Sequence, residues 1–284
     1  YRDADGTVLG MMPPGGYFFD QRFWPLAAAD ESEFARLEVH LPKTVWRAIT
    51  QPPWQRSNQP DFWQKLEAKT RELYEKTDYA LAVSASGQLF EAAQFLLGTD
   101  NLMADLALDR RRAEALLDRI MELNISATQK LMKAVGKYVQ MVKIGDDLGM
   151  QTGPLISPKM YREVFKPRYK EMYAEFKKGH NAKLYLHSCG SIYRLLPDII
   201  ETGVDILNPV QTSAAEMDPV RLKAEFGKDL VFWGGGCDTQ SILSQGTPQQ
   251  VRQEVQEKVS ILAPGGGLVF ATVHNTMPET PAEN

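Results

Sequence analysis

Two histidines and two cysteines in the second half of the chain have the side-chain chemistry of a zinc site. Each follows a short apolar segment, and they are His187, Cys189, Cys237 and His274. His187 and Cys189 are two residues apart, so at a strand end both side chains point to the same side. Imidazole nitrogen and thiolate sulfur are the ligands that Zn²⁺ prefers, and a catalytic zinc keeps an open position. We therefore predict a metal site formed from these residues. The alternative is two inert cysteines and a packing histidine, because a free cysteine often behaves as a small hydrophobe.

Carboxylate and amide side chains follow the same apolar segments. The residues predicted to be catalytic are Asp147, Gln151 and Asp238. The residues predicted to bind substrate are Asp146, Asn208, Gln211 and Asn275. Asp146 and Asp147 could also form a general acid/base pair, with Asp147 as the inward member. The alternative is that one of them caps the next helix and the other pairs with a nearby basic side chain.

Six short segments are predicted to be strands. Each is rich in β-branched or aromatic residues and is apolar on consecutive positions, which indicates a parallel sheet buried on both faces. The predicted strands cover residues 79–83, 138–144, 183–186, 204–207, 230–233 and 268–272. In parallel α/β folds the active site lies at the carboxyl ends of the strands. We therefore expect the candidate residues to gather at that edge.

Amphipathic helices are predicted between the strands. One covers residues 110–135, where apolar side chains recur at three- and four-residue steps. Two more begin at Ser157-Pro158 and Thr247-Pro248, where a capping residue precedes a proline at the first helical position. Shorter helices are predicted over 194–201 and 219–226. Uninterrupted alternation of strand and helix indicates βαβ units in one sheet.

The fold class predicted from this pattern is α/β, as a TIM-type (β/α)₈ barrel truncated at both ends. A complete barrel would need about two more strands before residue 79 and a helix after residue 284. Residues 1–77 are rich in Gly, Pro and Trp, for example Pro52-Pro53-Trp54. We predict that they form an irregular cap or insertion packed on the barrel, and that residues 78–284 form the barrel body.

The composition excludes several classes of protein. The chain has 284 residues and a formal net charge of -4, with 43% hydrophobic and 24% charged residues. These values are typical of a globular protein, and a slightly acidic chain without a Lys/Arg block is a poor nucleic-acid binder. No apolar run is long enough to span a membrane, and no signal peptide is recognisable. Two cysteines cannot form a disulfide framework, so we expect a reducing, cytoplasmic setting.

Four motifs at the predicted strand ends resemble the uroporphyrinogen decarboxylase superfamily. They are IGDDLG (144–149), LHSCGSI (186–192), DILNPVQ (205–211) and FWGGGCDTQ (232–240). Within the superfamily they are most similar to the corrinoid-dependent methyltransferase branch. The resemblance implies a TIM-type barrel, and it implies that the His-X-Cys motif, here His187 and Cys189, binds zinc. In coenzyme M methyltransferases a third ligand cysteine lies near the last strand. Here His274 occupies that region, and Cys237 comes one strand earlier.

The function that we predict is that of a zinc-dependent methyltransferase. The resemblance implies that it exchanges a methyl group between a small methylated substrate and a corrinoid (cobalamin) carried by a partner protein. A methyl ether is one candidate substrate, by O-demethylation. Two alternatives stay open: a metal-free decarboxylase of a small polycarboxylate that uses Asp147 as acid/base, and a non-catalytic barrel that binds a tetrapyrrole or corrinoid. Neither nucleic acid nor a membrane is an expected partner.

Overall fold

The computed structural model describes residues 1–50 and 57–284 and divides the chain into two compact units. One unit consists of Tyr1–Tyr79 and Gly87–Tyr138, and the other of Ala80–Ser86 and Val139–Asn284. The domain boundary predicted after residue 77 lies near the end of the first segment, but residues 87–138 group with the N-terminal residues. Pro52, Pro53 and Trp54 of the predicted cap lie outside the described residues.

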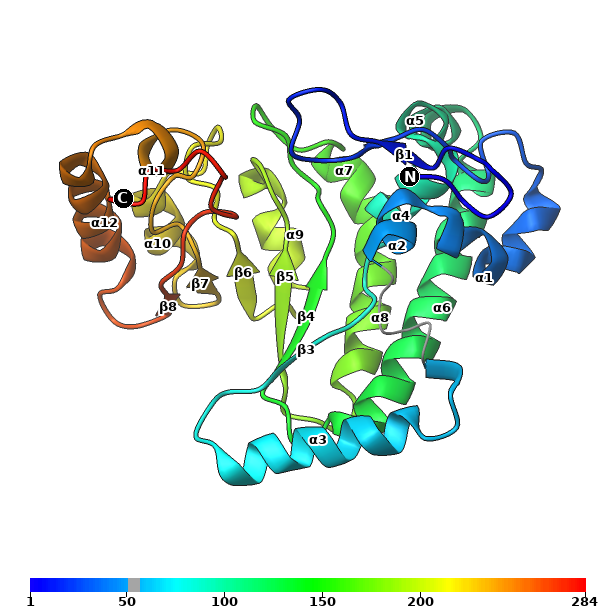
Figure 1. Cartoon of the computed structure of the whole chain (residues 1–284), viewed down its shortest axis with the longest axis horizontal. Coiled ribbons are helices and arrows are strands. Elements are labelled where there is room, and N and C mark those ends of the chain that lie inside the picture. Colours follow the sequence, from blue (N-terminus) through cyan, green and yellow to red (C-terminus); the bar gives the residue numbers. More distant parts are fainter. Residues whose placement is uncertain (51–56) are drawn as a thin grey trace. The chain divides into compact units, whose positions relative to one another are not determined.

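The second unit is built on a six-stranded parallel sheet, in which the strand order follows the chain order (Figure 1). Its strands are β3 (Ala82–Ser84), β4 (Met141–Gly145), β5 (Lys183–His187), β6 (Ile206–Asn208), β7 (Val231–Trp233) and β8 (Leu268–Val269). Each strand overlaps one of the six predicted segments, although β3, β4, β5 and β6 each end one residue later than predicted. The predicted α/β class and its parallel sheet are therefore confirmed. Within the described residues β3 and β8 do not pair, and the sheet is therefore open.

Three successive residues of β5 are buried, which explains why the strand segments are apolar on consecutive positions and do not alternate with polar residues. Leu184, Tyr185 and Leu186 are each at most 5% exposed, although successive side chains of a strand point to opposite faces. Both faces of this strand are therefore covered. His187, the last residue of β5, is only half-buried and faces the carboxyl edge of the sheet.

Helices and short turns separate the strands of the second unit. They are α7 (Pro158–Met160), the π-helical turn η4 (Tyr161–Phe165), α8 (Lys166–Lys177), the 3₁₀ turn η5 (Tyr193–Leu195), α9 (Leu196–Ile200), α10 (Pro219–Phe226), α11 (Ile242–Gln245) and α12 (Pro248–Leu262). The predicted caps are present. The Ser157 hydroxyl accepts a hydrogen bond from the Met160 N–H, and Thr247 forms a capping box with Gln250. The helix predicted over 194–201 begins instead as 3₁₀.

The first unit is mainly helical. It contains a hairpin of β1 (Gly10–Met11) and β2 (Asp20–Gln21), the 3₁₀ turns η1 (Glu31–Arg36) and η2 (Leu41–Lys43), and the helices α1 (Leu37–His40), α2 (Val45–Thr50), α3 (Phe62–Lys76), α4 (Phe90–Leu97), α5 (Thr99–Leu108) and α6 (Arg110–Val135). α6 has the predicted bounds and buries Leu116, Ile120 and Leu131. α3 lies within the segment that we predicted to be irregular.

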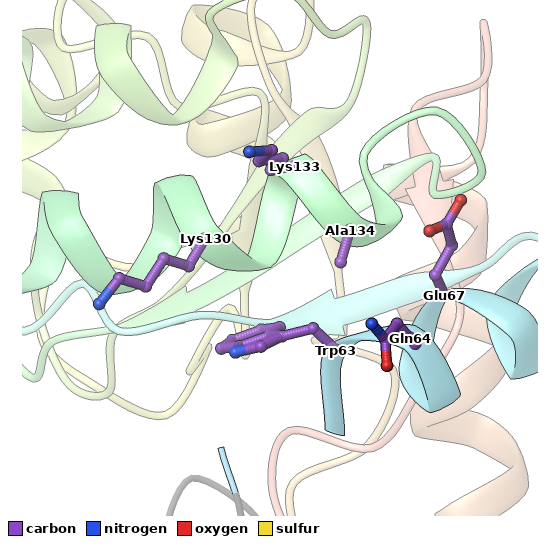
Figure 2. Close-up of a pocket in the computed structure, with 6 residues that line it drawn as sticks. All are labelled: Trp63, Gln64, Glu67, Lys130, Lys133 and Ala134. Atoms are coloured by element: carbon purple, nitrogen blue, oxygen red, sulfur yellow. The ribbon is translucent and has the colours of Figure 1, made fainter. Parts of the chain in front are cut away.

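An open pocket lies between α3 and α6 (Figure 2). Its volume is about 310 Å³. The residues that line it are Trp63, Gln64, Glu67, Lys130, Lys133 and Ala134. None of the helices in residues 1–50 and 57–284 combines the length and the apolar character needed to cross a membrane.

Candidate metal centre

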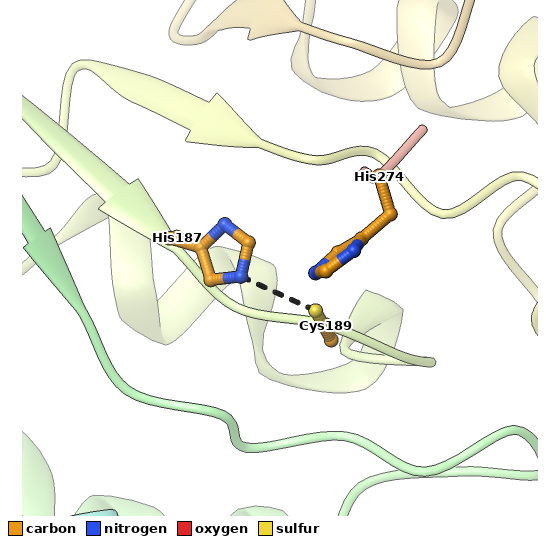
Figure 3. Close-up of side chains that lie close together, drawn as sticks. All are labelled: His187, Cys189 and His274. Carbon is orange, nitrogen blue, oxygen red and sulfur yellow. Dashed lines mark hydrogen bonds between the residues drawn. The ribbon is translucent and has the colours of Figure 1, made fainter. Parts of the chain in front are cut away.

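Three of the four predicted metal ligands come together at the carboxyl edge of the sheet. They are His187 at the end of β5, Cys189 two residues later, and His274 after β8 (Figure 3). Their ligand atoms all lie within 4.8 Å of one another, and Cys189 Sγ is 3.3 Å from His187 Nε2. Figure 3 shows the His274 ring turned toward both of the other side chains. Residues distant in the sequence thus form one compact nitrogen and sulfur donor set.

The donor set fits a zinc ion. Zn–N bonds of ~2.0–2.1 Å and Zn–S bonds of ~2.3 Å in a tetrahedral arrangement separate ligand atoms by roughly 3.3–3.8 Å. The separation of 3.3 Å between Cys189 Sγ and His187 Nε2 lies at the short end of that range, and the ligand atoms of all three residues lie within 4.8 Å of one another. Imidazole and thiolate together favour zinc over the hard cations, which select oxygen ligands. Three protein ligands leave a fourth position for a substrate atom.

The environment of His274 favours the neutral imidazole that a metal requires. Partial desolvation of the ring lowers the pKa of His274 below the ordinary histidine value, and the electrostatic influence of His187 lowers it further. The carboxylate of Asp147 acts in the opposite direction without reversing the shift. A lowered pKa favours the neutral ring, whose free lone pair a metal ligand requires.

The loop that carries Cys189 is held by hydrogen bonds to neighbouring strand ends. The Cys189 N–H donates to Asp147 Oδ1 at 2.8 Å, and the Gly190 N–H donates to Gln211 Oε1 at 2.8 Å. Gly190 has a φ of 81°, and a Cβ there would lie 2.5 Å from the carbonyl carbon of Gly149. Any other residue would therefore be strained at this position and would clash with the β4 side of the site.

The two adjacent aspartates have different surroundings. Asp147 is partly exposed, and its Oδ1 lies 4.0 Å from His187 Nε2, beside the cluster. Asp146 is fully buried and accepts a hydrogen bond of 2.6 Å from the Tyr169 hydroxyl of α8. Burial raises the pKa of Tyr169 well above its ordinary value, and the charge of Asp146 adds to this shift. Tyr169 therefore stays protonated and donates to the carboxylate.

The predicted amide residues form a chain of hydrogen bonds behind the Cys189 loop. Gln211 Nε2 donates to Gln151 Oε1 at 3.0 Å, and Gln151 Nε2 donates to the Ser213 carbonyl at 2.6 Å. Asn208 contacts His187 directly, with 2.6 Å between Asn208 Oδ1 and His187 Nδ1. Asn275 is exposed and follows His274 in the chain. Gln151, Asn208 and Gln211 thus support the cluster through one another and through the backbone.

The structure does not bring Cys237 into the cluster. Its thiol donates to Glu254 Oε2 of α12 at 3.2 Å, and the neighbouring Asp238 N–H donates to the same oxygen at 3.1 Å. Burial raises the pKa of the Cys237 thiol to about 12, and the hydrogen bond to Glu254 adds to this. The Asp238 carboxylate is buried and accepts from the Ser241 hydroxyl at 2.5 Å. Cys237 is thus tied to α12, whereas Asp238 also accepts a hydrogen bond of 3.4 Å from the Ser213 hydroxyl on the loop after β6.

Sequence reasoning missed two residues that contact this region. Tyr169 and Glu254 lie on the helices α8 and α12, far from any strand end in the sequence. Each meets a predicted site residue only because the helix packs back against the sheet. A periodic helix pattern predicts which of its residues face the sheet, but not which of them faces a carboxylate or a thiol.

Comparison with protein-family models identifies the family of this chain. The model of the uroporphyrinogen decarboxylase (URO-D) family matches residues 66–284, more than half of the chain. The chain therefore belongs to the URO-D family, which confirms the resemblance seen in the four motifs.

Two similar proteins are methyltransferases. A methylated-thiol–coenzyme M methyltransferase from Methanosarcina mazei is 25% identical over 198 residues, which are 69% of this chain and 48% of the relative. The chain thus spans about half the length of this curated relative. A solved structure of a methyltransferase from Methanosarcina mazei superposes with a TM-score of 0.59 over 79% of this chain and 63% of the other, at 20% identity. This structural likeness establishes the shared fold.

Proposed function

We propose that this chain carries the metal centre of a zinc-dependent methyltransferase that works with a corrinoid protein. The observation that carries the proposal is the convergence of His187, Cys189 and His274 at the carboxyl edge of the sheet. Membership of the URO-D family and similarity to a methyltransferase of methylated thiols support methyl transfer as the chemistry.

In the proposed reaction, His187 Nε2, Cys189 Sγ and an imidazole nitrogen of His274 would hold the zinc. A bound zinc ion would supply Lewis acidity that stabilises the negative charge left on sulfur or oxygen when the methyl group departs. The carbon–sulfur or carbon–oxygen bond breaks, and its electron pair stays on the leaving atom. A corrinoid on the partner protein would supply the electron pair that accepts the methyl group.

The residues around the cluster have positioning roles in this proposal. Asp147 accepts a hydrogen bond from the Cys189 N–H, and Gln211 accepts one from the Gly190 N–H. Gln211 in turn donates to Gln151. These contacts keep the cysteine loop in place while a ligand atom enters the fourth position. The partly exposed side of Asp147 also faces the space where a polar substrate group would bind.

The substrate that we propose is a small methylated thiol, with a methyl ether as the second candidate. The similar relative acts on methylated thiols by its name, which supports sulfur as the leaving atom. One thiolate and two neutral imidazoles leave a bound Zn²⁺ with a net positive charge. A positive metal centre stabilises a developing thiolate and also a developing alkoxide or phenolate. The donor set therefore accepts both kinds of leaving atom.

Metal content tests the proposal first. Elemental mass spectrometry of the full chain, before and after chelation and zinc reloading, is expected to show about one zinc per chain. Cys189→Ala and His274→Ala should lose it, whereas Cys237→Ala should retain it because its thiol is bound to Glu254. Zinc-free protein after reloading, or full zinc in Cys189→Ala, would contradict the proposal.

Methyl transfer is then measured by absorbance, as methylcobalamin forms from reduced cobalamin and a methylated thiol or a methyl aryl ether. Activity that follows zinc content across the three variants supports the assignment. Methyl transfer that persists in zinc-free protein would contradict the role proposed for the metal.

A further inference from the structure

The side chain of Asn208 contacts both a ligand of the candidate metal centre and the neighbouring strand. Asn208 is the last residue of β6 and pairs in register with His187, the last residue of β5. The Ser188 N–H also donates to the Asn208 carbonyl at 2.8 Å, which continues the ladder beyond the strand end. The positions of His187 and Asn208 side by side are thus set by the sheet itself.

The orientation of the Asn208 amide is determined by its second contact. Asn208 Nδ2 lies 2.8 Å from the carbonyl oxygen of Trp233, the last residue of β7. A backbone carbonyl only accepts hydrogen bonds, so the amide atom facing it must be the NH₂ group. The opposite atom, 2.6 Å from His187 Nδ1, must then be the amide oxygen. An amide oxygen only accepts, and His187 Nδ1 must therefore carry the proton.

This proton placement determines what the other ring nitrogen can do. A neutral imidazole with its proton on Nδ1 has its lone pair on Nε2. His187 Nε2 is the atom that lies 3.3 Å from Cys189 Sγ and belongs to the cluster with His274. A proton on Nε2 would occupy the position where a metal binds. The tautomer set by Asn208 is thus the one that a metal ligand needs.

We infer that Asn208 is a positioning residue that locks His187 in the Nδ1–H tautomer and so presents the Nε2 lone pair to the metal. Two hydrogen bonds in series thus link three neighbouring strands: the Trp233 carbonyl of β7 orients Asn208 of β6, and Asn208 orients His187 of β5. Each side of the Asn208 amide makes one of these contacts, and together they fix its orientation toward His187. Only the zinc readout of this inference rests on the proposed function.

The tautomer is measured directly by long-range ¹H–¹⁵N correlation spectra of the histidine rings in the metal-free full chain. The chain has only four histidines, so His187→Gln identifies the His187 signals by their loss. At a pH of about 8, above the ordinary histidine pKa, His187 is expected to show a protonated Nδ1 and an unprotonated Nε2. A protonated Nε2 in the metal-free protein would overturn the inference, whether or not the protein binds zinc.

Two substitutions separate positioning from simple structural support. Asn208→Leu removes the acceptor, so the Nε2–H tautomer should appear and zinc affinity should fall about 10- to 100-fold in competition with a chromophoric chelator. Asn208→Asp keeps an acceptor for Nδ1 but loses the donor to the Trp233 carbonyl. It should therefore unfold more easily than the wild type, yet keep the Nδ1–H tautomer and zinc affinity within a few-fold.

The outcomes distinguish this inference from the proposed function. If zinc affinity falls in Asn208→Asp in step with its stability, the role of Asn208 is structural and the inference is wrong. The same holds if Asn208→Leu changes neither the tautomer nor zinc affinity. If the wild-type chain binds no zinc, the proposed function fails, whereas the spectra still decide the tautomer.

Discussion

The hydrogen bond between Tyr169 and Asp146 is expected to contribute measurably to stability, and Tyr169→Phe removes it with little change in volume. Asp146 is fully buried and Tyr169 is 1% exposed, with 2.6 Å between the hydroxyl and the carboxylate. A hydrogen bond to a charged group contributes about 1.5–3 kcal/mol. The substitution should lower the free energy of unfolding by that amount, since no water can replace the lost donor. At about 2–4 °C per kcal/mol, the melting temperature should fall by roughly 3–12 °C.

Tyr173→Phe is the matched control. Tyr173 packs against Tyr169 in α8 with ring centroids 5.4 Å apart, and it is 2% exposed. Removing its hydroxyl changes the same aromatic stack without touching the bond to Asp146. Urea unfolding followed by circular dichroism compares the two variants, and equal slopes confirm comparable unfolding reactions. Equal destabilisation by both substitutions would refute the reasoning, because the carboxylate contact would then add nothing specific. In the background of Asp146→Asn, the difference between the two should shrink.

Three further predictions concern the second unit. Cys237→Ala should keep its zinc but lower the free energy of unfolding by about 1–3 kcal/mol, since Glu254 loses a buried donor; zinc analysis and urea unfolding check this. Burial alone would raise the pKa of Asp205, but hydrogen bonds from Lys177 and the Leu184 N–H lower it overall. Its stabilisation is therefore present above the ordinary carboxyl pKa of about 4 and is lost as the pH falls through the lowered value. Asp205→Asn should be less stable at pH 7, and the gap should close in unfolding curves recorded in acid. Chelation of zinc should leave the far-ultraviolet circular dichroism unchanged, because the sheet and its hydrogen bonds do not depend on metal; loss of secondary structure would contradict this.

Much of the second unit could be predicted from the sequence because its elements depend on local patterns. Strands buried on both faces are continuous apolar runs, and the helices after Ser157 and Thr247 begin with visible caps. α3 was missed although Phe62, Leu66 and Leu73 recur along one face, because it follows the Gly-, Pro- and Trp-rich segment that indicated an irregular cap. Its helical character comes from good helix formers and from exposed pairs such as Lys76 with Glu72. The short helices α4 and α5 meet at Gly98, whose φ of 90° interrupts the periodicity.

The residues of the candidate site could be predicted only in part from the sequence. The rule that functional residues lie at the carboxyl ends of parallel strands was enough to predict that His187, Cys189 and His274 lie close together. The same reasoning cannot show that Cys237, which also follows a strand, lies outside the cluster, because its position depends on a hydrogen bond to Glu254 of α12. Spacing likewise does not show that Asp146 is buried while Asp147 stays partly exposed. Adjacent strand-end residues point in opposite directions, and only the packing of α8 determines which of the two is covered.

The arrangement of the cluster also bears on how a metal would bind. His187 is held by Asn208 of β6, and the Cys189 N–H is held by Asp147 after β4, so neighbouring strand ends position two ligands from both sides. These hydrogen bonds join protein groups only, so they do not need a metal to form. In many small zinc domains, by contrast, the chain folds only when the metal binds. A ligand set ordered in advance loses little entropy on binding, which favours affinity. With a metal bound, such a ligand set would also resist rearrangement as a substrate enters the open position. His274 comes from the segment after β8 and is the exposed member of the three. An exchange of ligands during turnover would therefore involve His274 before the pair on the β5 loop.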